Sequence, residues 1–570
     1  MADGSIREKD PNDLEIPMGK RTKLYRFFEI LPGALSYGMV AALFIFSMIS
    51  PTLGAIYLLI IIVITLVKAI GVAVRTYQGY QVVQNAIKVD WHERVEELKN
   101  PHENFERLRP EVEEDEMGWL GMRKIKEVGR RHRTREYGIS EHVENLRAIS
   151  VAPSEYPNPE KVCHAVIMVA YNEGMETLEP SVEAVLNNTF DAKRVIFVFG
   201  YEERGGEEIE QNAKALQKKY KHEFYDFLIV KHPDGVKHEI KGKGPNLSCA
   251  GRELAAYVEK KHIPFENVIV TSLDSDNRMH RTYLDYVAYE FIVREDRQRL
   301  SYQPVSLFTN NIWDASAPMR VIATSNSFFN IINTMRPHML RNFASHSQPL
   351  TALASMDFWS KKTIVEDGHQ YWRSLFFFRG NYDVVSIRVP IYQDAVIEET
   401  FWRTAKAQFI QLRRWDYGAS DVAYVGVRMC DKKRRKMPLI KLFPRFWRLL
   451  DGHVTLAAMS PIVAFGGWVP SLMNPESRQV VAHNLPNTVA VVQTFALVGL
   501  FMMILYSLKM LPPRPAKYRK GRKILMILQW VLMPVVALVY TSAAGFYSQT
   551  RLMIGKYMES FDVTRKVVKK

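Results

Sequence analysis

The chain has 570 residues, of which 47% are hydrophobic and 24% charged, and its formal net charge is +15. This balance excludes a disordered chain and a protein embedded in membrane throughout. Three cysteines without a CxxC pair exclude a disulfide scaffold and a cysteine-rich metal site, and they favour a reducing compartment. The positive charge fits nucleic acid, anionic lipid or a phosphorylated substrate, and the placement of the basic residues has to separate these partners.

A long uncharged stretch lies behind a polar leader of about thirty residues. No charged side chain occurs from Ile30 to Val67, and a bilayer core needs about 20 apolar residues per helix. Ser50-Pro51 interrupts the stretch, so the sequence predicts a membrane-spanning hairpin of Leu31–Ile49 and Leu53–Val74. We discount a cleaved signal peptide because the stretch is about twice as long as the apolar part of one. Basic residues flank the hairpin, and the positive-inside bias places them in the cytoplasm.

The middle of the chain has the composition of a globular protein. Residues 75–160 are dense in Glu, Arg and Lys around single apolar residues, which predicts solvated helices packed on a larger domain. From Val162 the short apolar runs HAVIMVAY, RVIFVF, DFLIVK and NVIVTSL alternate with polar helical stretches. Such β-branched runs predict strands covered on both faces, and the alternation predicts a parallel sheet in an α/β domain at residues 161–431. Ligands bind such sheets at the carboxyl ends of the strands.

Polar side chains follow three of these runs. They are Tyr171, Asn172 and Glu173 after the first run, Glu202 and Glu203 after the second, and Asp274 and Asp276 after the fourth. Two carboxylates one residue apart at the end of a buried strand can hold a divalent cation that also binds diphosphate oxygens. The structural interpretation is that Asp276 or Asn277 caps a helix beginning near Arg281, and for an isolated Asp-x-Asp it is the commoner one.

Two further motifs are weak when taken singly. The stretch KGKGPN could bring backbone amides and Lys243 close to phosphates, but it is not a Walker A loop and by itself indicates a flexible turn. The pair Glu366-Asp367 offers two more carboxylates and by itself indicates a surface turn.

The stretch FWRTAKAQFIQLRRW predicts a helix. Gln411, Arg414 and Trp415 are spaced i, i+3, i+4 and therefore share one face of it. For a lone helix the safer interpretation makes Trp415 a core anchor with Arg414 stacked beside it.

Residues 432–452 combine the run KKRRK with PLIKLFPRFWRLL, in which Leu, Phe and Trp are interleaved with basic residues. This pattern predicts an amphipathic helix at the inner membrane face, attracted to anionic headgroups, and a solvated basic linker is nearly as good an interpretation. Because the charge lies here and no nucleic-acid-binding motif is recognisable, nucleic acid is the least favoured partner.

Three uncharged runs predict membrane spans between residues 453 and 548, at Gly452–Pro475, Gln479–Leu508 and Ile524–Phe546. Two spans before the globular segment and three after it would put the tail, residues 549–570, outside the cell. That tail carries six basic residues, which the positive-inside bias places inside. Either one C-terminal run is re-entrant, with Pro461, Pro470 and Pro534 as candidate breaks, or the bias fails here.

The order of the motifs is more informative than any one of them. YNE, KGKGPN, DSD, ED and QLRRW, flanked by membrane spans, resemble the membrane-embedded glycosyltransferase family 2 enzymes, which include cellulose, chitin and hyaluronan synthases. The resemblance covers Val162 to Gly418. It implies a GT-A fold, a nucleotide-diphosphate sugar donor such as a UDP-sugar, a Mg²⁺ or Mn²⁺ ion, and inversion at the anomeric carbon.

Carried over position by position, the resemblance implies a nucleotide pocket edged by Tyr171, Asn172, Glu173 and Glu202. It places Lys243 near the donor, Asp274 near the nucleotide and Asp276 on the metal ion that holds the diphosphate.

The remaining motifs supply the implied acceptor side. Asp367, preceded by Glu366, looks like the general base, and Gln411, Arg414 and Trp415 resemble the motif that closes over donor and acceptor. Two departures matter. YEER stands where many members have an acidic DDGS-like turn, so that Glu202 or Glu203 replaces it or the base pocket differs, and Leu412 stands where glutamine or arginine is common.

The sequence thus favours an inverting glycosyltransferase of the plasma (inner) membrane with a cytoplasmic catalytic domain, acting on a glycan or lipid-linked acceptor, with processive polysaccharide synthesis as one form. A transporter or channel with a non-catalytic sugar-nucleotide-binding domain is the alternative, and an inactive sugar-binding scaffold is a third. The expected division is a cytoplasmic tail (1–29), a membrane hairpin (30–74), a charged helical segment (75–160), the GT-A domain (161–431), an interfacial segment (432–452), a membrane region (453–548) and a basic tail (549–570).

Overall fold

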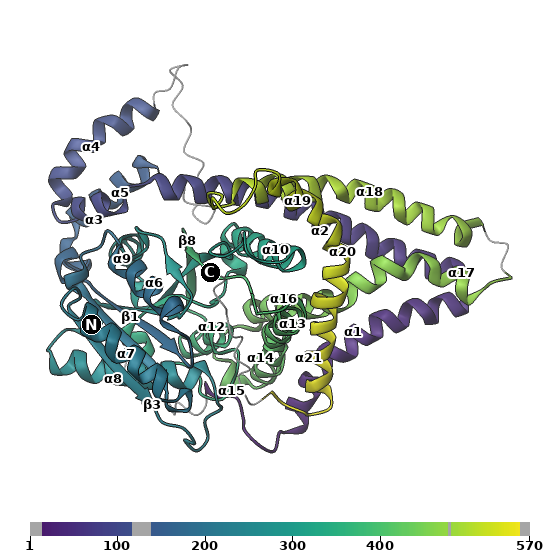
Figure 1. Ribbon diagram of the computed structural model, residues 1–570, viewed down its shortest axis with the longest axis horizontal. Coiled ribbons are helices and arrows are strands. Elements are labelled where there is room, and N and C mark those ends of the chain that lie inside the picture. The colour runs from purple at the N-terminus through teal and green to yellow at the C-terminus, as the bar shows by residue number, and fades with distance from the viewer. Residues whose placement is uncertain (1–13, 117–137, 477–479, 559–570) are drawn as a thin grey trace.

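The computed structural model describes residues 14–116, 138–476 and 480–558. Figure 1 shows an α/β domain from which long helices extend to one side. Parts of both predicted tails and of the charged segment 75–160 lie outside the described residues.

Eight strands of the described chain form one sheet, in the order β3-β2-β1-β4-β7-β6-β8-β5. The strands are β1 (Cys163–Ala170), β2 (Val195–Glu202), β3 (Asp226–His232), β4 (Val268–Asp274), β5 (Arg278–Met279), β6 (Leu300–Leu307), β7 (Ser347–Pro349) and β8 (Asp383–Tyr392). The four apolar runs of the sequence form β1 to β4, which pair in parallel. The second half is mixed, because β7 pairs antiparallel with β4 and β6 while β8 pairs parallel with β6. The prediction of an α/β domain with a mostly parallel sheet is confirmed.

Helices cover both faces of the parallel half. Alternate residues of β1 explain this, since Val166 and Met168 pack against one layer of helices while Ala165 and Ile167 pack against the other. The first layer contains α6 (Met175–Leu186), α7 (Glu207–Tyr220) and α9 (Tyr283–Val293), and the second contains α8 (Lys243–Lys260) and α11 (Leu350–Ser355).

The other helices of the domain complete its two flanks. Those beside the second half of the sheet are α10 (Ala317–Thr334), α12 (Glu366–Phe377), α13 (Phe401–Asp416) and α14 (Ser420–Cys430). The charged segment forms α3 (Trp91–Glu97), α4 (Pro101–Glu116) and α5 (Ile139–Val151). Trp91 anchors α3 on α9, with its ring stacked on Tyr286 at 3.6 Å between centroids.

Five stretches of the described residues are long and apolar enough to cross a bilayer, which marks the chain as a membrane protein: Lys23–Ile49, Pro51–Lys88, Leu439–Met473, Asn484–Lys509 and Arg522–Met553. The first four are built by α1 (Lys23–Ile49), α2 (Pro51–Lys88), α16 (Leu439–Phe465) with α17 (Val469–Met473), and α18 (Val480–Lys509). They reach away from the domain to a common tip, where Asn474 Nδ2 donates to the Ser47 carbonyl at 2.6 Å.

Two details of this region differ from a simple string of spans. After α15 (Lys432–Arg435), the single helix α16 contains both the basic-aromatic stretch and the apolar run that follows it. The last apolar stretch combines α19 (Arg522–Leu528), α20 (Met533–Val536) and α21 (Ala543–Met553), joined by a 3₁₀ turn at 529–532 and a π-helical turn at 537–542. In Figure 1 this yellow stretch runs across the direction of α1, α2 and α18.

Candidate active site

A cleft of about 1120 Å³, with open solvent included, lies at the carboxyl ends of β1, β2 and β4 and faces α12 and α13. Every predicted site residue except Asn172 and Glu203 lines it. One side, which we name the strand wall, is formed by Tyr171, Glu173, Glu202, Asp274 and Asp276. The other side, the helix wall, is formed by Glu366, Asp367, Gln411, Arg414 and Trp415. Lys243 also lines the cleft and contacts both walls.

The YNE turn is held by its own glutamate. The Glu173 carboxylate accepts the backbone N–H groups of Tyr171 at 2.7 Å and Asn172 at 3.1 Å, and it accepts the Ser275 hydroxyl at 3.0 Å. Burial raises the pKa of Glu173, while these hydrogen bonds oppose the rise. Glu173 therefore ties the end of β1 to the turn after β4. The Asn172 side chain is exposed, and only its backbone takes part.

Glu202 lies at the end of β2 and is almost fully buried. Its carboxylate is paired with the guanidinium of Arg204, which in turn lies over the ring of Tyr171 at 4.2 Å from the centroid. The YEER turn thus presents an acceptor and a donor side by side, next to an aromatic ring that lines the cleft.

Lys243 is the first residue of α8, so the KGKGPN stretch is largely helical rather than the flexible turn that it indicates in isolation. Gly244 explains the close fit, because a Cβ there would lie 2.3 Å from the carbonyl of Ser360. The Lys243 ammonium lies 2.6 Å from Asp274 Oδ1 and 3.4 Å from Glu366 Oε1. Burial alone would lower the pKa of Lys243, but the two carboxylates outweigh burial and raise it.

The ED pair begins α12 and is no surface turn. Glu366 is buried, and burial raises its pKa to about 7 although Lys243 opposes the rise. Asp367 lines the cleft beside it, and its Oδ1 accepts the N–H of Gly368 at 2.7 Å. The first turn of a helix favours carboxylates because its backbone N–H groups point toward them.

The Asp-x-Asp pair does not cap a helix. α9 begins at Tyr283 with Thr282 at its N-cap, so the structural interpretation of Asp276 is wrong. Asp276 Oδ2 accepts the backbone N–H of Asp394 at 3.2 Å, which orients the carboxylate within the cleft.

Helix α13 contributes three residues to the helix wall. Gln411 is buried and accepts from Gln408 Nε2 at 3.1 Å. Trp415 is 37% exposed and lines the cleft, which excludes the interpretation of this residue as a core anchor. Its ring lies 6.0 Å from that of Phe308, and Arg414 lies beside it in the cleft lining.

The donor set fits a divalent ion that arrives with its substrate. The described residues contain no group of three or more His, Cys, Asp or Glu side chains that could hold a metal ion by themselves. Mg²⁺ is commonly bound by one or two carboxylates together with substrate phosphates. Asp276, held by a backbone N–H at the edge of a solvent-open cleft, is such a carboxylate.

Some cleft residues escaped the sequence analysis, among them Phe308 and Gln393. Phe308 follows β6 and Gln393 follows β8, and these two strands are parallel, so their carboxyl ends also reach the cleft. The run RVPIY before Gln393 carries the same signal as the four runs that we used, but it lies far from them in the chain.

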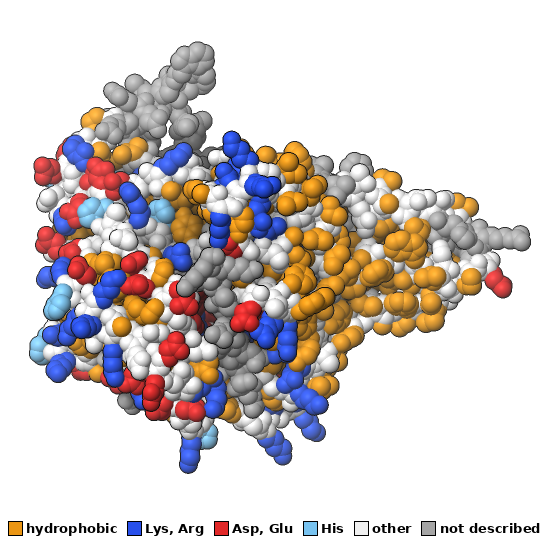
Figure 2. Space-filling view, in the orientation of Figure 1, with side chains coloured by type: hydrophobic (Ala, Val, Ile, Leu, Met, Phe, Trp, Pro, Cys, Tyr) orange, Lys and Arg blue, Asp and Glu red, His pale blue; other side chains and the backbone are white. Residues whose placement is uncertain are grey.

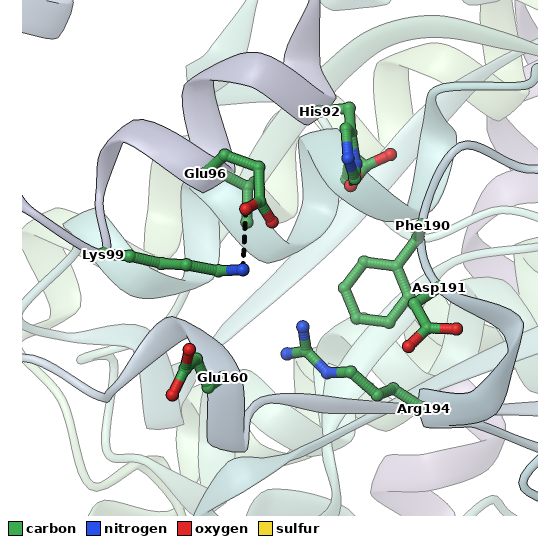
Figure 3. Close-up of a pocket in the computed structure, with 9 residues that line it drawn as sticks. His92, Glu96, Lys99, Glu160, Phe190, Asp191 and Arg194 are labelled. Carbon is green, nitrogen blue, oxygen red and sulfur yellow. Dashed lines mark hydrogen bonds and ion pairs between the residues drawn. The ribbon is translucent and has the colours of Figure 1, made fainter.

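A second cavity, of about 650 Å³ with open solvent included, lies at the opposite edge of the sheet, where β1 and β2 begin. Figure 3 shows its charged lining: the Lys99 ammonium points to Glu96, 2.7 Å away, and Arg194 extends into the same space. His92 Nδ1 lies 3.2 Å from Asp285 Oδ1. Ligands of parallel sheets bind at the carboxyl ends instead, so this cavity is not the candidate active site.

Comparison with known proteins gives limited likeness. No family model matches the sequence, and no curated protein matches it. The solved structure of the mannosyltransferase PcManGT from Pyrobaculum calidifontis, in complex with GDP-Man and Mn²⁺, has a TM-score of 0.36 and 14% identity, covering 60% of this chain and 86% of that one. A TarS fragment from S. aureus in complex with UDP has a TM-score of 0.30 and 11% identity, covering 70% and 94%. The chemistry of the cleft therefore rests on its own side chains.

Proposed function

We propose that the protein is an inverting glycosyltransferase of the membrane-embedded family 2 type, which moves a sugar from a nucleotide-diphosphate donor to a glycan or lipid-linked acceptor on the cytoplasmic side of the plasma (inner) membrane. The observation that carries the proposal is the convergence in one cleft of side chains from six separate segments: the ends of β1, β2 and β4, the starts of α8 and α12, and α13. Repeated transfer to one acceptor, as in polysaccharide synthesis, is one form of this activity.

The strand wall suits the diphosphate of the donor. Asp276 would hold a Mg²⁺ or Mn²⁺ ion on the diphosphate, and this ion would neutralise charge that develops on the leaving oxygens. The Lys243 ammonium sits beside Asp274, within reach of the same groups. Arg414 faces them from the helix wall and supplies a further cation for the leaving diphosphate.

The helix wall suits the acceptor. In an inverting transfer the acceptor hydroxyl forms a bond to the anomeric carbon as the bond from that carbon to the diphosphate oxygen breaks. The hydroxyl proton must go to a base on the acceptor side, which contributes a factor of about 10² to 10⁴ in rate. Both carboxylates line the cleft, but Glu366 is buried against Lys243, whereas Asp367 is partly exposed. We therefore assign this role to Asp367. Trp415 offers an aromatic face for a sugar ring.

The edge near Tyr171 suits the nucleobase. Tyr171 provides a ring for stacking, while Glu202 with Arg204 offers an acceptor beside a donor. Every nucleobase presents a hydrogen-bond donor next to an acceptor, so the pair can bind a base edge without selecting one base. We propose a UDP-sugar as the donor, as the resemblance implies.

The test uses the full-length protein in lipid nanodiscs. A panel of nucleotide sugars, with and without Mn²⁺, is assayed for release of the nucleoside diphosphate, and Asp276→Asn is assayed beside Glu208→Gln, an exposed acid on α7, as a matched control. We expect metal-dependent release that Asp276→Asn abolishes and Glu208→Gln leaves intact. Nucleotide binding without turnover of any donor would overturn the proposal in favour of a sugar-nucleotide-binding scaffold or a transporter.

A further inference from the structure

We propose that residues 522–553, which we name the surface helix, do not cross the bilayer but lie along its inner face with one apolar stripe in the lipid. The chain then has four membrane spans, and both tails lie on the side of the α/β domain. This inference is independent of the catalytic assignment, because it concerns which surfaces of the chain meet lipid.

The path of the other apolar helices shows which end of each helix lies at the domain and which lies at the tip. α1 leaves the domain and ends at the tip, and α2 begins there after Ser50 and returns. α16 with α17 goes out to the tip, where Asn474 contacts Ser47, and α18 returns. After α18 the chain is again at the domain, because the Trp313 indole donates to the carbonyl of Pro512 at 3.1 Å and Lys517 pairs with Asp314 at 2.8 Å.

The surface helix begins at the domain. Arg522 Nη2 donates to the carbonyl of Trp313 at 2.8 Å, and Arg320 of α10 donates to the side chain of Gln529 at 2.5 Å. These contacts place the first turns against the connection between β6 and α10.

The surface helix also ends at the domain. The Ser548 hydroxyl donates to the carbonyl of Arg413 in α13 at 2.6 Å. Arg26, in the first turn of α1, donates to the carbonyl of Met553 at 2.7 Å, and the Met558 N–H donates to Tyr417 at 3.2 Å. A helix that crosses the membrane must place its ends on opposite sides of the bilayer core, which is about 30 Å thick. Both ends of this helix instead contact residues on the domain side of the membrane.

The first half of the surface helix, residues 524–539, exposes an apolar stripe. Leu525 and Ile527 widen it at its start, and its other members recur three or four residues apart, as on one face of a helix: Ile524, Leu528, Val531, Val535 and Val539. The opposite face packs inward through Trp530 and Val536, which are buried. One face of this apolar stretch therefore packs on the protein, and the other face is exposed.

Lipid is the partner that fits this face. Figure 2 shows apolar side chains continuing from this region over the helices that reach to the tip, so the stripe belongs to one apolar surface. Basic residues lie just before the helix and in its first turn, and such residues are drawn to anionic headgroups at the inner leaflet: Lys517, Arg519 and Lys520 before it and Lys523 within it. An amphipathic helix in this setting lies in the plane of the interface.

Four spans remove the conflict between the apolar runs and the basic tail, because the tail then lies inside, as the positive-inside bias requires. The surface helix then also connects the membrane to the helix wall. α21 packs on α13 through Ser548 and through Tyr547, whose hydroxyl accepts from Arg413 Nη1 at 3.2 Å. α13 carries Arg414 and Trp415 into the cleft on its other side.

Reporter fusions in a bacterial host test the side of the C-terminus. A fusion after Lys570 is expected to give a fluorescent green fluorescent protein and an inactive alkaline phosphatase, as is a fusion after Met510, whereas a fusion after Asn474 should give the reverse. An active phosphatase after Lys570, with the two controls as stated, would overturn the four-span arrangement.

Depth measurements test the lipid contact. The variants Leu528→Cys, Val535→Cys and Val539→Cys, each in a background without the three native cysteines, are labelled with an environment-sensitive fluorophore in nanodiscs containing anionic lipid. Quenching by lipids brominated near the headgroup should be strong and equal at the three positions, while position 208 on α7 should show none. Quenching that shifts to deeply brominated lipid along the series would indicate a crossing helix. No quenching at any position would mean that another protein covers the stripe, and either result would overturn the proposal.

Discussion

The two edges of the parallel sheet carry similar numbers of charged side chains but arrange them differently. At the amino edge the ion pairs are separate from one another: Lys99 pairs with Glu96, and His92 lies beside Asp285. At the carboxyl edge a single cation, Lys243, contacts carboxylates of two elements, Asp274 of β4 and Glu366 of α12. The difference teaches that a cavity lined by charges becomes a candidate active site when several segments aim their charges at one space, because an isolated pair only neutralises itself.

Replacing Asp367, the proposed general base, should have the largest effect. Asp367→Asn keeps the shape of the side chain but removes its ability to take a proton, so we expect transfer to fall by a factor of about 10² to 10⁴. Nucleotide binding, measured by calorimetry, should persist. Glu160→Gln at the amino edge is the matched control and should leave both unchanged. Normal turnover in Asp367→Asn would show that another group is the base.

Lys243 should matter for stability as well as for the donor. Lys243→Met leaves Asp274 and Glu366 facing each other without a cation, and removing one partner of a buried ion pair costs about 3 to 5 kcal/mol. The double variant Lys243→Met/Glu366→Gln should recover part of the loss, because one uncompensated charge is removed. Thermal unfolding of the single and double variants measures this. Equal destabilisation in both would mean that Glu366 does not depend on the lysine.

Replacing Glu202 tests whether the carboxyl edge binds the nucleobase of the donor. Glu202→Gln replaces a charged acceptor by a neutral one, and hydrogen bonds to charged groups contribute about 1.5 to 3 kcal/mol. We expect binding of UDP to weaken by a factor of about 10 to 100, with the rate at saturating donor little changed. Glu203→Gln, an exposed neighbour, is the control. A loss in rate at saturation with unchanged binding would contradict a role in base recognition.

His164 should make the amino edge sensitive to acid. Burial, with a contribution from Arg194, lowers the pKa of His164 to about 3, whereas the unfolded chain has its ordinary value of 6.5. Above pH 6.5 the ring is neutral in both states and does not change the free energy of unfolding. As the pH falls below 6.5, the unfolded state binds a proton that the folded state does not bind, so the free energy of unfolding declines by up to about 1.4 kcal/mol per pH unit.

The variant His164→Leu tests this pH dependence. We expect the difference in melting temperature between pH 7 and pH 5 to shrink in the variant. An unchanged difference would mean that other groups dominate the acid response.

Lys99→Gln should have the smallest effect. Its pair with Glu96 is at the surface, where such pairs contribute about 0.2 to 1 kcal/mol, and no transfer chemistry is assigned to that edge. Turnover should be unchanged. A loss of turnover would make the amino-edge cavity a second functional site and would remove the contrast between the two edges.

Much of the fold could be read from local patterns. The four apolar runs became β1 to β4 because a strand covered on both faces needs side chains that are apolar at nearly every position, and this requirement acts on a few consecutive residues. The motifs after those strands were equally readable, because parallel strands bring their carboxyl ends to one edge. Gln393 was missed because the half of the sheet that delivers it pairs with the first half only through the short strand β7.

The sequence by itself determined where apolar helices and buried strands form, and which acidic and basic side chains follow them. Only the tertiary structure decided that Asp276 is no helix cap, that Lys243 joins two distant carboxylates, and that the last apolar run begins and ends at the domain. The physical reason is that apolar character acts over neighbouring residues, whereas the partner of a charge and the direction of a helix depend on contacts between residues that lie tens to hundreds of positions apart.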